Sequence, residues 1–255
     1  MDSSLAALNA LNFFMADVQG GLGPFLGVFL QAREWSPAQI GVVMTIGGIA
    51  GMVVTTPAGA LVDRTRHKQM IVVATAVTVT VASLAILIKP DFAIVAGAQI
   101  VSGIAGAAIG PAIAAITLGL VHQSGFAHQL GRNEAFNHGG NVVAAALAGG
   151  IGYFAGLGAV FVILAVMALL SIVATFFIDA RHIDHRAARG ATQNNDDGVA
   201  SFAVLLQSKE LLVLGATLTL FHLGNAAMLP LMGQAGVGHD GSNPSAFTAA
   251  TIIVA

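Results

Sequence analysis

Long runs without a charged side chain are the feature of this sequence that most restricts its fold. One covers the 28 residues from Trp35 to Val62, and another covers the 19 residues from Met70 to Ile88. Each can cross a bilayer as a helix, because about 20 apolar residues span the hydrocarbon core. Charged residues make up 9% of the chain and hydrophobic residues 56%, whereas soluble proteins carry about 25% charged residues. The sequence therefore predicts an all-α integral membrane protein.

The remaining apolar runs predict a series of such helices. We expect membrane helices over about residues 5–30, 38–62, 70–88 and 92–121, two more between Glu134 and Asp179, and a seventh over about 211–235. A polar loop is expected over residues 122–138, and a glycine-rich turn over 152–158. Ala255 lies inside another apolar run that begins near Ala246. We interpret that run as the start of an eighth helix in a truncated sequence.

The positions of the basic residues predict the orientation of these helices. With the N-terminus inside, the inner loops hold eight of the 10 Lys and Arg residues, and the outer loops hold only Arg33 and Lys89. Cytoplasmic loops of membrane proteins carry an excess of basic residues. We therefore expect a multi-pass protein of the cytoplasmic (inner) membrane with its N-terminus inside.

The loop between the second and third predicted helices carries a recognisable pattern, Gly-x-x-x-Asp-Arg-x-x-x-Lys. The residues that match it are Gly59, Asp63, Arg64 and Lys68. This pattern resembles the signature loop of the major facilitator superfamily of secondary transporters. Arg66 stands where that family usually has a glycine, and His67 where it usually has a basic residue. The order of helices and the loop lengths also resemble the family over the whole available chain.

The resemblance implies a bundle of inverted three-helix repeats, six helices in each half. Residues 1–180 would then form the N-terminal six-helix bundle, residues 181–200 a polar cytoplasmic linker, and residues 201–255 the start of the C-terminal bundle, with helix 7 and part of helix 8. The resemblance also implies secondary active transport of a small solute by alternating access. In the family the signature loop acts as a conformational latch, which assigns a gating role to its four matching residues.

Asp17 is the only acidic residue inside a predicted membrane helix, and it lies near the middle of the first one. A carboxylate at that depth costs about 2.5–3.5 kcal/mol or more, so it usually serves a transport pathway, a proton relay or a substrate contact. Its alternative role is packing, as a protonated side chain bonded to a neighbouring helix. Gly20 and Pro24 follow, and Pro24 removes a helical N–H, which predicts a kink or local unwinding.

Three further polar residues are candidates for the transport pathway. The resemblance implies that helices 1, 4 and 7 line a central cavity, which places Gln99, His222 and Asn225 beside Asp17 as cavity-lining groups. Proton-coupled antiporters of the family commonly have arginine at the position of Gln99, and Gly-Pro where this chain has Gly149-Gly150. Both departures argue against drug–proton antiport. Gln99 and His222 could also be buried packing residues with satisfied hydrogen bonds.

The sequence leaves several functions to weigh. We expect a transporter coupled to a proton through Asp17, with an uncoupled facilitator or an inactive fragment as alternatives. A membrane-embedded enzyme fits poorly, because one Asp and one lone His at membrane depth do not form a catalytic set. The pair His182 and His185 has a spacing that could bind metal, but in a charged loop it is more often solvated. We therefore expect no enzyme activity, cofactor, metal or nucleic acid, and the lipid bilayer, a small solute and a proton as partners.

Overall fold

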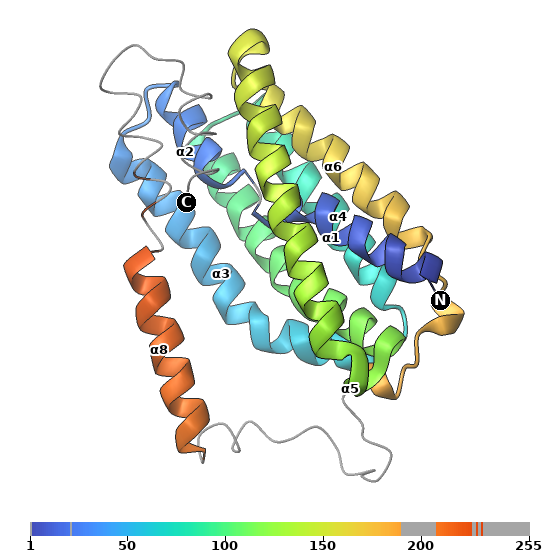
Figure 1. Cartoon of the computed structure of the whole chain (residues 1–255). Helices are drawn as coiled ribbons and strands as arrows, with labels where there is room; N and C mark the ends of the chain where they lie inside the picture. The colour runs from blue at the N-terminus through green and yellow to red at the C-terminus, as the bar shows by residue number, and fades with distance from the viewer. Residues whose placement is uncertain (1, 21, 190–207, 226–227, 229–230, 232–255) are drawn as a thin grey trace.

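The structure is a computed structural model, and it describes residues 2–20, 22–189, 208–225, 228 and 231. This part of the chain is helical and contains no strand (Figure 1). The long helices are α1 Asp2–Gly20, α2 Gly23–Gln31, α3 Pro37–Arg64, α4 Lys68–Ile88, α5 Phe92–Ala155, α6 Ala159–Phe176 and α8 Lys209–Asn225. Two short 3₁₀ turns, η1 Ala180–His182 and η2 Ala187–Arg189, follow α6. The expected all-α fold class is confirmed.

Local capping residues explain where the helices begin and end. Ser36 caps α3, where its side chain accepts from the backbone N–H of Gln39 and the Gln39 side chain accepts from the Ser36 N–H. The Asp91 side chain accepts from the Ile94 N–H at the start of α5. Gly156 ends α5 with a φ of 80°, a conformation that glycine adopts without steric cost. The observed turn is therefore shorter than the one expected over 152–158, because α5 continues to Ala155 and α6 begins at Ala159.

The prediction of a polar loop over residues 122–138 is wrong, because this segment is helical apart from the break at His122. α5 runs from Phe92 to Ala155 and is broken only at His122, whose φ of 53° and ψ of −177° are non-helical. Figure 1 shows the two arms of α5 running in opposite directions from this hinge. The second arm stays helical because its polar side chains find partners. Gln129 bonds to Asn9 of α1, and Asn133 bonds to Thr117 of the first arm. The prediction of two separate membrane passes over this region is compatible with the hinge.

The helices α1 to α6 form one bundle, and α8 lies apart from it. Five helical segments of the described chain, α1 and α2 together with α3, α4, α5 and α6, are long and apolar enough to span a membrane. Because α5 turns back at His122, these five segments contain six stretches that run along the bundle. α8 is exposed throughout residues 209–224 and lies to one side in Figure 1. The last residues of the predicted seventh helix, the eighth helix and the linker after residue 189 lie outside the described residues.

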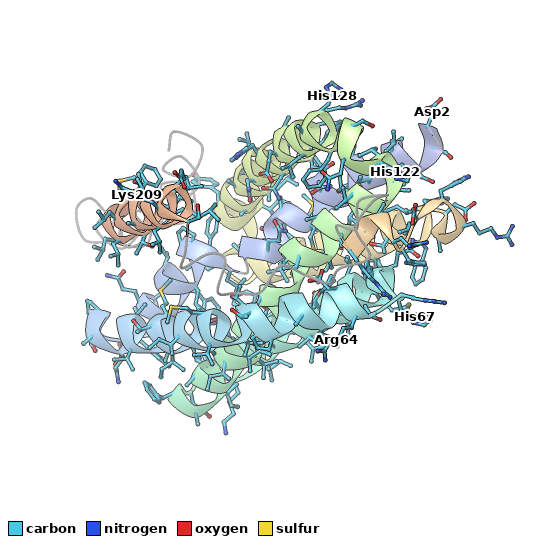
Figure 2. All side chains as sticks on the ribbon, turned by 90° about the horizontal axis from the view of Figure 1, so that it is seen from below. Asp2, Arg64, His67, His122, His128 and Lys209 are labelled. Atoms are coloured by element: carbon cyan, nitrogen blue, oxygen red, sulfur yellow. The ribbon has the colours of Figure 1, made fainter. Side chains whose placement is uncertain are left out.

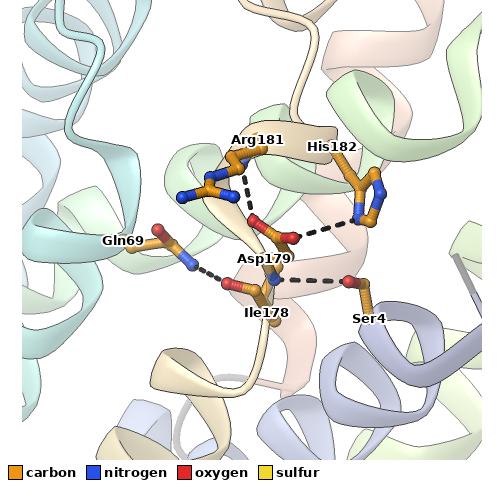
Figure 3. Close-up of polar contacts among 6 residues, drawn as sticks. All are labelled: Ser4, Gln69, Ile178, Asp179, Arg181 and His182. Carbon is orange, nitrogen blue, oxygen red and sulfur yellow. Dashed lines mark hydrogen bonds and ion pairs between the residues drawn. The ribbon is translucent and has the colours of Figure 1, made fainter.

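One end of the bundle gathers the N-terminus, the turn between α3 and α4, and the segment after α6. The backbone N–H of Asp179 donates to the Ser4 hydroxyl at 3.2 Å, and Gln69 Nε2 donates to the Ile178 carbonyl at 2.7 Å (Figure 3). Figure 2 views the molecule from below and labels Arg64 and His67 on this end, away from Lys209 on α8. This end carries most of the basic residues of the bundle.

Candidate functional site

Asp17 lies in the last turn of α1, where the first membrane pass is interrupted. α1 ends at Gly20, and the chain resumes as α2 at Gly23, with Pro24 in the first turn. Proline is tolerated there because the first N–H groups of a helix have no helical acceptor. The Asp17 atom Oδ2 is buried and has no hydrogen-bond partner in the described part of the chain. A buried polar atom without a partner is costly, which makes this carboxyl group a candidate for function.

A cavity of about 80 Å³ lies beside Asp17. We call it the helix-1 cavity. The break between α1 and α2 forms one wall, and Asn141, Ala144 and Ala145 of α5 form the other. Asn141 is the only polar side chain besides Asp17 among the described residues that line it. Asn141 was not among the predicted site residues, because it lies far from Asp17 in the chain.

A close approach of two helices places Asn141 beside Asp17. A Cβ atom added to Gly140 of α5 would overlap the carbonyl oxygen of Phe13 and lie 3.0 Å from the Cβ of Ala16. Glycine therefore lets the main chain of α5 rest directly on α1, one turn before Asp17. The next residue of α5 is Asn141, and its position at the helix-1 cavity follows from this contact.

Four amide side chains repeat at four-residue intervals along the second arm of α5. We call them the amide row: Gln129, Asn133, Asn137 and Asn141. Residues four apart lie on one face of a helix, so the row follows a single stripe. The spacing is visible in the sequence, but it carries this meaning only once the segment is known to be helical.

The first two members of the amide row tie α5 to α1. Gln129 Nε2 donates to Asn9 Oδ1 and to Asn133 Oδ1, both at 2.9 Å. Asn133 Nδ2 donates to Thr117 Oγ1 of the first α5 arm at 2.8 Å. All four side chains are buried, and a satisfied buried network of this kind fixes the relative position of the helices.

The last two members form a chain of hydrogen bonds that starts at the helix-1 cavity. Asn141 Nδ2 donates to Asn137 Oδ1 at 3.2 Å. Asn137 Nδ2 in turn donates to Gln19 Oε1 of α1 at 2.9 Å. Because each amide donates away from the cavity, the carbonyl oxygen of Asn141 is left as an acceptor.

A larger cavity of about 360 Å³ lies on the other side of the α1–α2 break. We call it the solute-sized cavity, since ligand pockets start at about 300 Å³. Its polar side chains are Gln19, Gln99 and Ser102. Gly20, Leu22 and Gly23 line both cavities. The structure therefore places Gln99 and Asp17 on opposite sides of the same helix break, in neighbouring cavities.

Glycines bring α3 and α5 together at the wall of the solute-sized cavity. A Cβ atom on Gly47 would lie 3.0 Å from the carbonyl oxygen of Gln99, and one on Gly51 would lie 3.1 Å from that of Gly103. A Cβ atom on Gly103 would overlap the Gly47 carbonyl oxygen. Small residues let helices approach closely within membranes, and here they also set the position of Gln99.

The signature loop is closed by a buried lysine. Lys68 is 1% exposed, and its Nζ donates to the carbonyl oxygens of Val62 at 2.8 Å and Thr65 at 3.0 Å. These bonds join the start of α4 to the end of α3. Asp63 is half-buried and Arg64 is exposed. A Cβ atom on Gly59 would meet no atom within 4 Å, so its surface is open in the described part of the chain.

The segment after α6 packs on this loop and on the hinge of α5. The Asp184 N–H donates to the Gly119 carbonyl oxygen at 2.9 Å, and Arg189 Nη2 donates to the Arg64 carbonyl oxygen at 3.5 Å. Backbone N–H groups of Ala187 and then Arg186 hold the pKa of Asp184 below its ordinary value. Residues 183–189 therefore connect the signature loop to the hinge region of α5.

His222 and Asn225 are not brought to the Asp17 region by the structure. His222 is exposed on α8, and its ring lies 5.7 Å from that of Phe221. Asn225 ends α8, and its side chain is outside the described residues. Their expected place at a central cavity stays a prediction.

The surface of the bundle defines the class of protein. Large apolar side chains are exposed on the outer faces of the spans, among them Met52 and Val53 of α3, Leu169 and Phe176 of α6, and Val81 of α4. Such a surface would aggregate in water, but it suits contact with lipid, where backbone groups must be bonded inside helices. The chain is a multi-pass α-helical membrane protein.

Comparison with known proteins gives its family. The family model described as Major Facilitator Superfamily matches residues 4–255. The chain is also 45% identical over 253 residues to proteins named as uncharacterized MFS-type transporters from two strains of Mycobacterium tuberculosis, CDC 1551 and H37Rv. The match covers 98% of this chain and 60% of each relative. The chain belongs to the Major Facilitator Superfamily, which points to a transporter rather than an enzyme.

Proposed function

We propose that the protein is a secondary active transporter that moves a small solute by alternating access, with proton coupling through Asp17. The observation that carries the proposal is the buried, unpartnered Oδ2 of Asp17 at the break of the first membrane pass. Ionisable groups inside membranes usually belong to pathways or relays. A proton would neutralise this carboxyl group and remove most of the cost of burying its charge.

The two neighbouring cavities support separate binding sites for the solute and the proton. The solute-sized cavity, with Gln99 in its wall, is the candidate binding surface of the N-terminal half. The helix-1 cavity holds the carboxyl group. Since Gly20 and Gly23 line both, a movement of the helix break would alter the two cavities together. His222 and Asn225 are proposed to complete the pathway from helix 7, and Gly20 with Pro24 to form the movable joint.

We further propose that the signature loop is a gate at the cytoplasmic face of the inner membrane. The basic residues around Lys68, Arg64 and Arg189 lie at the same end as the N-terminus, and by the charge rule this supports an inside location for that end. Gly59 and Asp63 present the open surface of the loop. In alternating access this surface would meet the second half of the transporter when the inner side closes.

An uncoupled facilitator is the alternative, and the variant Asp17→Asn separates the two. The protein is reconstituted in vesicles and tested with a panel of radiolabelled small solutes under an imposed pH gradient. Coupled transport predicts that Asp17→Asn loses accumulation against a gradient but still exchanges solute between equal concentrations. A facilitator predicts equilibration without accumulation in both proteins. Accumulation that is equal in wild type and variant would refute the role of Asp17.

A further inference from the structure

Two residues that line the helix-1 cavity each carry a hydrogen-bond acceptor without a donor in the described part of the chain. Asp17 Oδ2 is buried without a partner. The Asn141 amide is oriented by its bond to Asn137, and its carbonyl oxygen accepts no hydrogen bond in the described part of the chain. Asp17 and Asn141 both line the cavity, and two oxygen acceptors brought close together repel each other unless a proton or a cation lies between them.

The helix break adds backbone oxygen to the same cavity. Pro24 stands four residues after Gly20 and has no N–H, so the Gly20 carbonyl lacks the donor that a continuous helix would supply. Gly20 and Pro24 both line the cavity. In transporters, the ends of broken helices and unwound carbonyls are typical ligands of Na⁺ or H⁺.

The charge and size of the cavity select the kind of cation. Asp17 is the only titratable residue among those of α1, α2 and α5 that line it, and no described residue of α4 or α6 lines it. One carboxylate balances one positive charge, whereas divalent sites usually draw on several carboxylates. A volume of about 80 Å³ holds a small ion with one or two waters, since a water occupies about 30 Å³.

We propose that the helix-1 cavity is a Na⁺ site, in which Na⁺ competes with the proton for Asp17. The ligands are the Asp17 carboxylate, the Asn141 carbonyl oxygen and the backbone carbonyl of Gly20. A proton on Asp17 satisfies one acceptor, whereas Na⁺ coordinates all three oxygens at once. The inference rests on the proposed function only for the role of Asp17 as the coupling carboxylate.

The test follows the protonation of Asp17 directly and needs no solute. Dicyclohexylcarbodiimide is an apolar reagent that modifies protonated carboxyl groups inside membranes, and the modified peptide is quantified by mass spectrometry. Membranes with the wild-type protein are labelled at one pH in NaCl or in choline chloride of equal ionic strength. We expect Na⁺ to slow labelling of Asp17 about tenfold when its concentration is ten times its Kd, by simple competition.

Variants assign the effect to the cavity. Asn141→Leu removes the side-chain amide oxygen, so labelling should persist while protection by Na⁺ falls to the level of choline. Thr80→Val, a matched control on α4 whose hydroxyl bonds only to the Ala76 carbonyl, should keep full protection. Thermal unfolding of the purified protein gives a second readout, in which NaCl should raise the Tm of the wild type but not of Asp17→Asn. This second readout applies even if the reagent fails to reach Asp17.

The outcomes separate this inference from the proposed function. Labelling that depends on pH but not on Na⁺, with no Na⁺-specific rise in Tm, overturns the Na⁺ site and leaves a proton carrier. Protection by Na⁺ that survives in Asn141→Leu also overturns the proposed ligand set. Protection by Na⁺ together with normal solute accumulation by Asp17→Asn would instead refute the proposed function and keep the ion site.

Discussion

Gly140 of α5 lies directly on the main chain of Phe13 in α1, so that a Cβ atom at Gly140 would overlap the Phe13 carbonyl oxygen. This contact determines which residues of α5 face Asp17. It also fixes the distance between the two walls of the helix-1 cavity. The candidate site therefore depends on the packing of two helices as much as on its polar side chains.

The first prediction concerns this contact. Gly140→Ala should lower the Tm and destabilise the protein by about 1–3 kcal/mol, because overpacking forces the helices apart. The matched control is Gly150→Ala on the same helix, where a Cβ atom would meet nothing within 4 Å. That control should be neutral or slightly stabilising. Equal Tm values for both variants would contradict the close approach.

A second prediction concerns the lysine that closes the signature loop. Lys68→Met keeps most of the apolar stem but leaves the Val62 and Thr65 carbonyl oxygens without their donor. We expect a loss of about 1–3 kcal/mol, the usual cost of an unsatisfied buried group. Arg66→Gln, at an exposed neighbour, should change stability little. Thermal unfolding in detergent compares the Tm of the two variants. A Tm of Lys68→Met equal to that of the wild type would show that these bonds do not stabilise the loop.

A third prediction concerns the pH dependence of the segment after α6. Because folding lowers the pKa of Asp184, its bonds to the Arg186 and Ala187 N–H groups contribute fully above about pH 4, the ordinary value for aspartate. They are lost as the pH falls through the lowered pKa. The protection factor of the Ala187 amide, which is its exchange rate corrected for the intrinsic effect of pH, should therefore be high at neutral pH and fall on strong acidification. Asp184→Asn should exchange faster at neutral pH, and an unchanged rate would argue against this anchor.

The helices were predictable from local sequence signals, but the helical start of the second arm of α5 was not. The uncharged run from Trp35 to Val62 and the caps Ser36 and Asp91 are local features that act the same in any context. The polarity of residues 122–138 suggested a loop because the sequence does not show which partners a polar side chain will find. Gln129 and Asn133 are helical because Asn9 and Thr117 satisfy them.

The candidate site was predictable only in part for the same reason. Asp17 and Pro24 stand out by their position in an apolar run. Asn141 could not be linked to Asp17 from the sequence, since only the approach of α5 to α1 at Gly140 joins them. The placement of Gln99 in a cavity similarly depends on Gly47 of another helix.

The most direct test of the central claim is to measure cation movement during solute transport. Vesicles that contain the protein and a trapped pH-sensitive dye start with equal pH on both sides. A solute that the panel has identified is then added outside. The proposed coupling predicts that wild type moves protons with the solute and that Asp17→Asn does not, although it still exchanges the solute. Proton movement of equal size in both proteins would contradict the assignment of coupling to Asp17.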